Sequence, residues 1–147
     1  MADVLLYQAQ FLKGIPKAIQ AHLPARWQQI QSRQPYNWLV QFYFDEPEFH
    51  YEVSSAKYQG GWELGLHFES RDAALNRALL EGFRRHLFEI KETLGEQFEA
   101  EMWDRGWTKV YEVFPAERLT VAYQDKVARR LAAIIDSLQP ILIDLRA

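Results

Sequence analysis

The stretch that decides the fold is residues 37–69, NWLVQFYFDEPEFHYEVSSAKYQGGWELGLHFE. Apolar and polar side chains alternate along it, and the side chains of a β-strand point to opposite faces with a period of two residues. The pattern predicts three consecutive strands, joined by a turn at 45–48 and a longer connection at 56–61. One face of these strands should be buried, and its members are Trp38, Val40, Phe42, Phe44, Phe49, Tyr51, Val53, Trp62, Leu64, Leu66 and Phe68.

The opposite face of the same strands is polar and holds the best candidates for a site. It carries two of the four histidines of the chain, and its members are Gln41, Tyr43, Glu48, His50, Glu52, Glu63, His67 and Glu69. One register that the face pattern allows puts His50 directly across from His67, whereas a shift of two residues separates them. The pairing of the two imidazoles is therefore a hypothesis at this point.

The region before the strands has the apolar spacing of amphipathic helices and predicts a helical N-terminal arm over 1–34. Gly14 and Pro16 should interrupt the arm after a first helix over 3–13, because proline removes a backbone donor and glycine weakens a helix. A second helix should then run from Pro16 to about residue 31. Pro24 should bend or break it, so the arm is either one kinked helix pair or three short pieces.

The region after the strands predicts a helix, a second hairpin and a last helix. Helical spacing covers 71–94 and 117–138, and Pro140 should end the last helix. Between these helices, the runs 97–103 and 107–114 are rich in strand-forming residues and flank an Asp-Arg-Gly turn signal.

These elements predict the α+β class. The expected architecture is a single antiparallel sheet, made of a three-stranded meander plus a second hairpin and packed by helices. The order of elements is helix, three strands, helix, two strands, helix. At 147 residues with no linker-like shift in composition, the chain should form one domain over 1–147.

Composition excludes several classes of protein. The chain has no cysteine, which removes disulfides and thiolate metal sites and suits a reducing cytoplasm, where we expect this protein. Its net charge of −3 disfavours a protein that coats nucleic acid or anionic membrane. No apolar run approaches the roughly 20 residues needed to span a bilayer, so we expect no membrane association.

The first candidate site is the polar group on the three strands. Two imidazoles with a carboxylate can hold zinc or iron, or an imidazole can act as a general base that a carboxylate orients. The candidates are His50, His67, Glu52, Glu63, Glu69 and Tyr43. The alternative is a solvated polar face on which these are ordinary surface residues. The spacing matches no specific metal motif, and no cofactor is indicated.

The second candidate is the turn of the predicted second hairpin. Trp103, Arg105 and Trp107 surround it, and tryptophan and arginine are enriched at the energetic centres of protein interfaces. They would form a patch for a protein partner or a second copy of this chain. The alternative is that both tryptophans close one end of the core.

The second half of the chain has a pattern that a known type of domain shows. A long helix ends in IKETLG at 90–95, a short hairpin surrounds Trp103, and a last helix closes on Pro140. Over residues 62–142 this resembles an uncharacterised bacterial accessory domain found beside restriction-endonuclease-like nuclease domains. The resemblance implies an accessory role in nucleic-acid processing or defence, and it implies no catalytic residue.

Three functional hypotheses follow. The favoured one is a non-catalytic module that binds a protein partner or a ligand, because the sequence shows many core residues and no catalytic signature. The second is a metal-assisted or acid–base enzyme that uses His50, His67 and the neighbouring carboxylates. The third is the nucleic-acid accessory domain that the resemblance implies.

Overall fold

The computed structural model describes residues 4–147 and shows an α+β fold with one six-stranded antiparallel sheet. The predicted fold class is confirmed. The strands lie in the order β1-β2-β3-β4-β6-β5. In chain order the helices and strands are α1 (Gln8–Gln20), β1 (Gln31–Tyr36), β2 (Leu39–Tyr43), β3 (Phe49–Ala56), β4 (Gly61–Phe68), α2 (Ala73–Arg84), α3 (Leu87–Leu94), β5 (Glu99–Met102), β6 (Thr108–Pro115) and α4 (Val121–Arg146).

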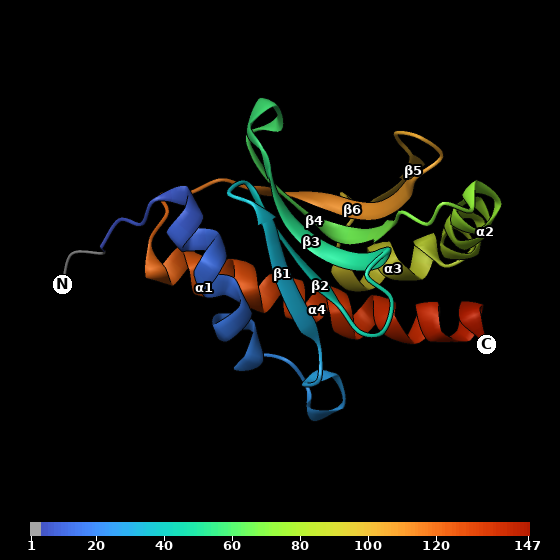
Figure 1. Ribbon diagram of the computed structural model, residues 1–147, viewed down its shortest axis with the longest axis horizontal. Coiled ribbons are helices and arrows are strands. Elements are labelled where there is room, and N and C mark those ends of the chain that lie inside the picture. Colours follow the sequence, from blue (N-terminus) through green and yellow to red (C-terminus); the bar gives the residue numbers. More distant parts are fainter. Residues whose placement is uncertain (1–3) are drawn as a thin grey trace.

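The core lies between one face of the sheet and the helices. Figure 1 shows α1, α3 and α4 together on one side, while the β3–β4 and β5–β6 turns project from the other side. Phe11 of α1 links these layers, since its ring stacks on Trp62 of β4 at 5.1 Å and on Tyr123 of α4 at 5.6 Å. The helices thus cover the apolar face that the alternation predicted and leave the polar face to the neighbouring turns.

The register of the central strands is one of those that the face pattern allowed. Val40 pairs with Val53 in the β2–β3 ladder. In the β3–β4 ladder His50 pairs with His67. The hypothesis of two imidazoles on directly opposite positions is therefore confirmed, and it fixes the geometry of the polar face.

A sixth strand, β1, occupies the end of the predicted helical arm. All of its residues are exposed and it pairs only with β2, so it is an edge strand. Pro35 lies within it, and an edge is where a sheet accepts proline, because no neighbour needs the missing N–H. Without a buried face the strand has no alternation, and this is why the sequence pattern did not predict it.

The rest of the arm contains the α-helix α1 and a short 3-10 helix at Ala25–Trp27, so the predicted break near Pro24 is confirmed and the one predicted at Gly14 and Pro16 is wrong. Gly14 and Pro16 both lie inside α1, which runs unbroken to Gln20. Gly14 gives room for the side chain of Gln124 on α4, since a Cβ there would lie 2.2 Å from the amide nitrogen. The packing of the buried face of α1 outweighs the hydrogen bond that Pro16 removes. The first three residues of the predicted arm lie outside the described residues.

The predicted boundaries of the other helices need two corrections. The single helix expected over 71–94 is divided into α2 and α3, which are separated at Arg85 and His86. The last helix continues through Pro140 to Arg146, because Leu142 beyond the proline is also buried against the core.

Trp38 is the one member of the predicted buried face that the structure places elsewhere. Its side chain is 45% exposed and stacks on Tyr36 with the rings parallel and 5.3 Å apart. Trp38 precedes β2, so the alternation of that strand does not apply to it.

Within residues 4–147, no helix is both long enough and apolar enough to cross a membrane.

Candidate metal centre

Four side chains of the polar face converge on one point. His50 and Glu52 lie two residues apart on β3 and therefore share a face. His67 lies on β4, and Glu69 directly follows the last residue of that strand. Each offers one ligand atom, and these four atoms all lie within 4.8 Å of one another. We call this group the His–Glu cluster. The expectation of a solvated face is wrong, because His50 and His67 are only 1% and 2% exposed.

The hydrogen bonds of His50 fix which of its nitrogens carries the proton. Its Nδ1 lies 2.9 Å from the carbonyl oxygen of Pro47, which can only accept, so Nδ1–H donates. Pro47 belongs to the turn between β2 and β3 that the sequence predicted. The turn therefore orients the ring so that Nε2 faces the cluster.

Gln41 and Arg33 indicate that Nε2 of His50 presents its lone pair. Arg33 has donors only, and its Nε donates to the side-chain oxygen of Gln41 at 2.5 Å. The amide nitrogen of Gln41 is therefore turned toward Nε2 of His50, 3.2 Å away, and donates to it. A proton on Nδ1 and a lone pair on Nε2 satisfy both contacts.

The ring of His67 is held from the opposite side. Its Nε2 lies 2.6 Å from a carboxylate oxygen of Glu63 and donates to it. The other oxygen of Glu63 accepts from the ammonium group of Lys109, also at 2.6 Å. A carboxylate bonded to the outer nitrogen of a histidine is the usual support of a metal-binding imidazole. Here it leaves Nδ1 of His67 facing the cluster.

The distances inside the cluster suit a small divalent ion. Four ligands at about 2.0–2.1 Å from a tetrahedral zinc lie roughly 3.3–3.4 Å from one another. In the cluster, Nε2 of His50 lies 2.9 Å from Glu52 and 3.8 Å from Glu69. Nδ1 of His67 lies 3.7 Å from Glu52 and 3.1 Å from Glu69. Each of these four histidine–carboxylate pairs therefore needs a shift of roughly 0.5 Å or less, and the two other pairs of ligand atoms lie within 4.8 Å.

Charge in the cluster shifts the pKa of its members in the metal-free chain. Burial by itself would raise the pKa of Glu52, but the surrounding positive charge, that of His67 foremost, lowers it to about 2. Burial would lower the pKa of His67, yet the charge of Glu52 and the hydrogen bonds to Glu63 and Glu69 raise it to about 10. Burial would raise the pKa of Glu63 as well, but the hydrogen bonds and charges of His67 and Lys109 together lower it.

The cluster forms part of the floor of a cleft of about 690 Å³. This volume is in the range of small-molecule sites. Trp103 and Trp107 of the β5–β6 turn line the cleft together with Arg105, so these three predicted interface residues contribute to the same cleft. Trp103 packs edge-on against His67, with ring centroids 5.6 Å apart.

Tyr43 is the predicted site residue that the structure does not bring to the cluster. Its ring is half-buried under the guanidinium group of Arg33, 5.6 Å from the ring centre. The sequence reasoning gave no role to Gln41, Arg33 or Lys109. Alternation placed Gln41 on the polar face, so its position could be predicted although its role could not. Arg33 and Lys109 belong to strands whose pairing with the meander no pattern in the sequence fixed.

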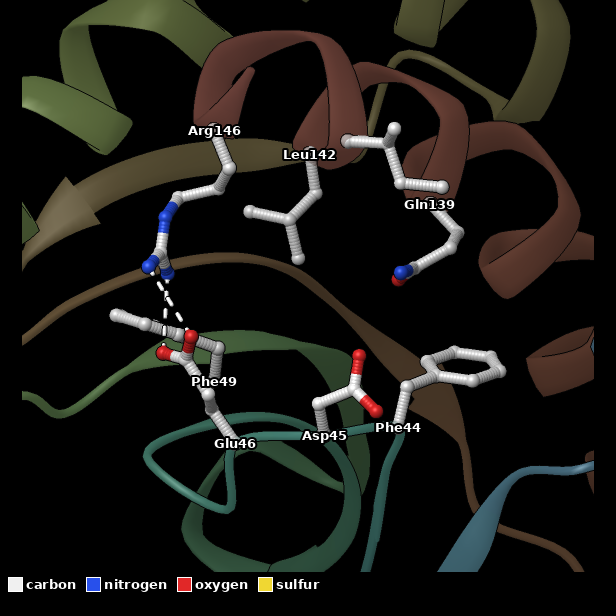
Figure 2. A pocket seen from close by; sticks show the side chains of 8 residues that line it. Phe44, Asp45, Glu46, Phe49, Gln139, Leu142 and Arg146 are labelled. Carbon is white, nitrogen blue, oxygen red and sulfur yellow. Dashed lines mark hydrogen bonds and ion pairs between the residues drawn. The ribbon is translucent and has the colours of Figure 1, made fainter.

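A second pocket, of about 250 Å³, lies between the β2–β3 turn and the end of α4. Figure 2 shows apolar side chains such as Phe49 and Leu142 lining it. Glu46 and Arg146 pair across it, with contacts of 3.1 and 3.2 Å. Arg146 is thus paired with Glu46, Asp45 is the other charged residue of the lining, and the pocket lacks the histidines that give the first cleft its chemistry.

Comparisons with protein-family models, with curated proteins and with solved structures find no match to this chain.

Proposed function

We propose that this protein is a ligand-binding module whose His–Glu cluster binds one divalent transition-metal ion. The ligands are Nε2 of His50, Nδ1 of His67 and one oxygen each of Glu52 and Glu69. Nitrogen and carboxylate donors in this proportion suit Zn²⁺, Fe²⁺ or Mn²⁺. This keeps the ligand-binding function favoured from the sequence and assigns the two histidines to it.

The observation that carries the proposal is the direction of the hydrogen bonds. His50 and His67 each have one nitrogen bound to an acceptor outside the cluster, which is how proteins hold metal-binding histidines. Nε2 of His50 then meets an oxygen of Glu52 at 2.9 Å, although neither atom holds a proton if Glu52 is ionised. A cation bound between two such acceptors removes their repulsion.

The competing explanation is an ion-pair network that needs no metal. In that case the charge of His67 offsets one of the two charges of Glu52 and Glu69, and the cluster only stabilises the sheet. The two explanations differ in what zinc does. A metal that binds the folded state alone, at 100 times its Kd, stabilises that state by about 2.7 kcal/mol. For a chain of this length that raises Tm by roughly 5–10 °C.

The test is a calorimetric titration of the chelator-treated protein with Zn²⁺, accompanied by a thermal melt. We expect one ion per chain and a higher Tm. Glu69→Gln should weaken zinc binding at least tenfold, and it should fold, since Glu69 lies after the end of β4 and is partly exposed. The matched control is Glu89→Gln on α3, which should leave binding unchanged. Equal zinc binding by both variants, or none by the unaltered protein, would reject the proposal.

A further inference from the structure

We infer that the cleft above the His–Glu cluster takes a small organic anion that joins a flat aromatic ring to a carboxylate or phosphate group. The inference rests on the proposed metal site and names the class of ligand that the ion would hold. Three features of the cleft support it: the side on which the ion would be accessible, the aromatic side chains of the walls, and the net charge of the cleft.

The accessible side of the cluster faces the cleft. His50, Glu52 and His67 are buried, whereas the side chain of Glu69 is 18% exposed. Glu52, His67 and Glu69 all line the cleft. An ion held by these four ligands that expands to a fifth position, as zinc can, would therefore take its fifth ligand from the cleft side, where an oxygen anion could bind.

The walls of the cleft offer flat aromatic surfaces. Tyr36 and Trp38 stack on each other and remain 59% and 45% exposed. Trp103, on the β5–β6 turn, is 44% exposed and contacts Trp107, with centroids 5.4 Å apart. All four line the same cleft. Exposed aromatic faces grouped around one cleft are typical of a site that stacks a planar ring.

The charges of the cleft suit an anion once the ion is bound. A divalent ion balances Glu52 and Glu69, and Lys109 balances Glu63, to which it donates at 2.6 Å. The walls then hold Arg33 and Arg105 against the single carboxylate of Asp104, so the cleft is left with net positive charge. Without the ion the floor keeps net negative charge and repels an anion. Binding of the anion should therefore depend on the metal.

Two probes represent the two possible anion groups, namely benzoate and adenosine 5′-monophosphate. Each should bind the zinc-loaded protein with saturable quenching of tryptophan fluorescence, and at least tenfold more weakly after chelation. Benzyl alcohol and adenosine keep the ring without the anion, while acetate and inorganic phosphate keep the anion without the ring. These half-probes should bind the zinc-loaded protein at least tenfold more weakly than the full probes do. The tighter of the two full probes tells whether a carboxylate or a phosphate is preferred.

Variants test the aromatic wall. Trp103→Leu should weaken the full probes at least tenfold and leave zinc binding unchanged, while the control Phe88→Ala, an exposed aromatic on α3, should change neither. Arg105→Gln on the exposed turn should weaken the probes severalfold and keeps the inference testable if Trp103→Leu does not fold.

Zinc binding in the calorimeter combined with no metal-dependent binding of either full probe would overturn this inference and leave the proposed metal site standing. Failure of zinc to bind would reject both. Equal binding of full probes and half-probes to the zinc-loaded protein would also overturn the inference, because it would show that one site does not recognise the ring and the anion together.

Discussion

The imidazole rings of His50 and His67 lie face to face across the β3–β4 ladder, 5.5 Å apart and 14° from parallel. They face the cluster with different nitrogens, Nε2 of the first and Nδ1 of the second. The reason is that their outer acceptors differ. The carbonyl of Pro47 holds Nδ1 of His50, and the carboxylate of Glu63 holds Nε2 of His67.

Glu63→Gln should weaken zinc binding by roughly 10–100-fold, the usual effect of losing an outer partner of a metal-binding histidine. The amide oxygen of glutamine can accept from His67 or from Lys109, but it no longer brings a charge to either. Zinc titration calorimetry measures the change. Glu101→Gln is the control, since Glu101 accepts from Tyr111 on the neighbouring strand and does not contact the cluster. An unchanged zinc affinity in Glu63→Gln would show that this carboxylate does not support the ligand.

Arg33→Met should change the protonation of His50 in the metal-free protein. Arg33 forces Gln41 to point its amide nitrogen at His50, and without Arg33 the amide can turn its oxygen there instead. The oxygen would favour a proton on Nε2 of His50. Long-range ¹H–¹⁵N spectra distinguish the tautomers, and we expect the proton on Nδ1 alone in the unaltered chain. A proton on Nε2 in the unaltered chain would contradict the lone pair that the metal site requires.

The metal-free protein should be most stable between about pH 4.5 and 6.5, where His67 and Glu52 give their full contributions. The pKa of His67 is raised from 6.5 to about 10 in the folded state, so its contribution is complete below 6.5 and is lost as pH rises through about 10. The pKa of Glu52 is lowered from 4.5 to about 2, so its contribution is complete above 4.5 and is lost as pH falls through about 2.

Urea denaturation in the presence of a chelator, repeated from pH 3 to pH 10, measures this profile. His67→Phe should remove the alkaline decline that belongs to the cluster, because it removes the group whose pKa differs between the two states. A stability that stays flat between pH 6.5 and pH 10 in the unaltered chain would show that His67 is not charged in the folded state.

The meander could be predicted because both of its signals are local. Strict alternation fixed the two faces, and the short turn that contains Pro47 limited the register of β2 against β3. The pairing of His50 with His67 was one of the allowed registers, and only the assembled sheet selects among them. What alternation could not predict is burial of the polar face, which depends on side chains such as Trp103 from elsewhere in the chain.

The parts that were not predicted depend on tertiary contacts. β1 has no buried face and therefore no pattern, yet it supplies Arg33 to the site. Gly14 and Pro16 disfavour a helix locally, but α1 packs against α4 and the sheet and continues through both. Pro140 is tolerated for the same reason.

A buried ion pair between Glu112 and Arg130 lies on the other face of the sheet from the His–Glu cluster. Glu112 of β6 pairs in register with Leu64, so it faces the helices, whereas Glu63 faces the cleft. Its buried carboxylate accepts from Nε of Arg130 on α4 at 2.6 Å. Arg130→Met should lower the free energy of unfolding by about 3–5 kcal/mol, because it leaves a buried charge unpaired. The double variant Arg130→Met/Glu112→Leu should recover most of that loss. Urea denaturation measures both variants.

Zinc affinity should stay unchanged in the double variant, because the pair lies on the face opposite the His–Glu cluster. Weaker zinc binding there would show that the two faces are coupled through β6.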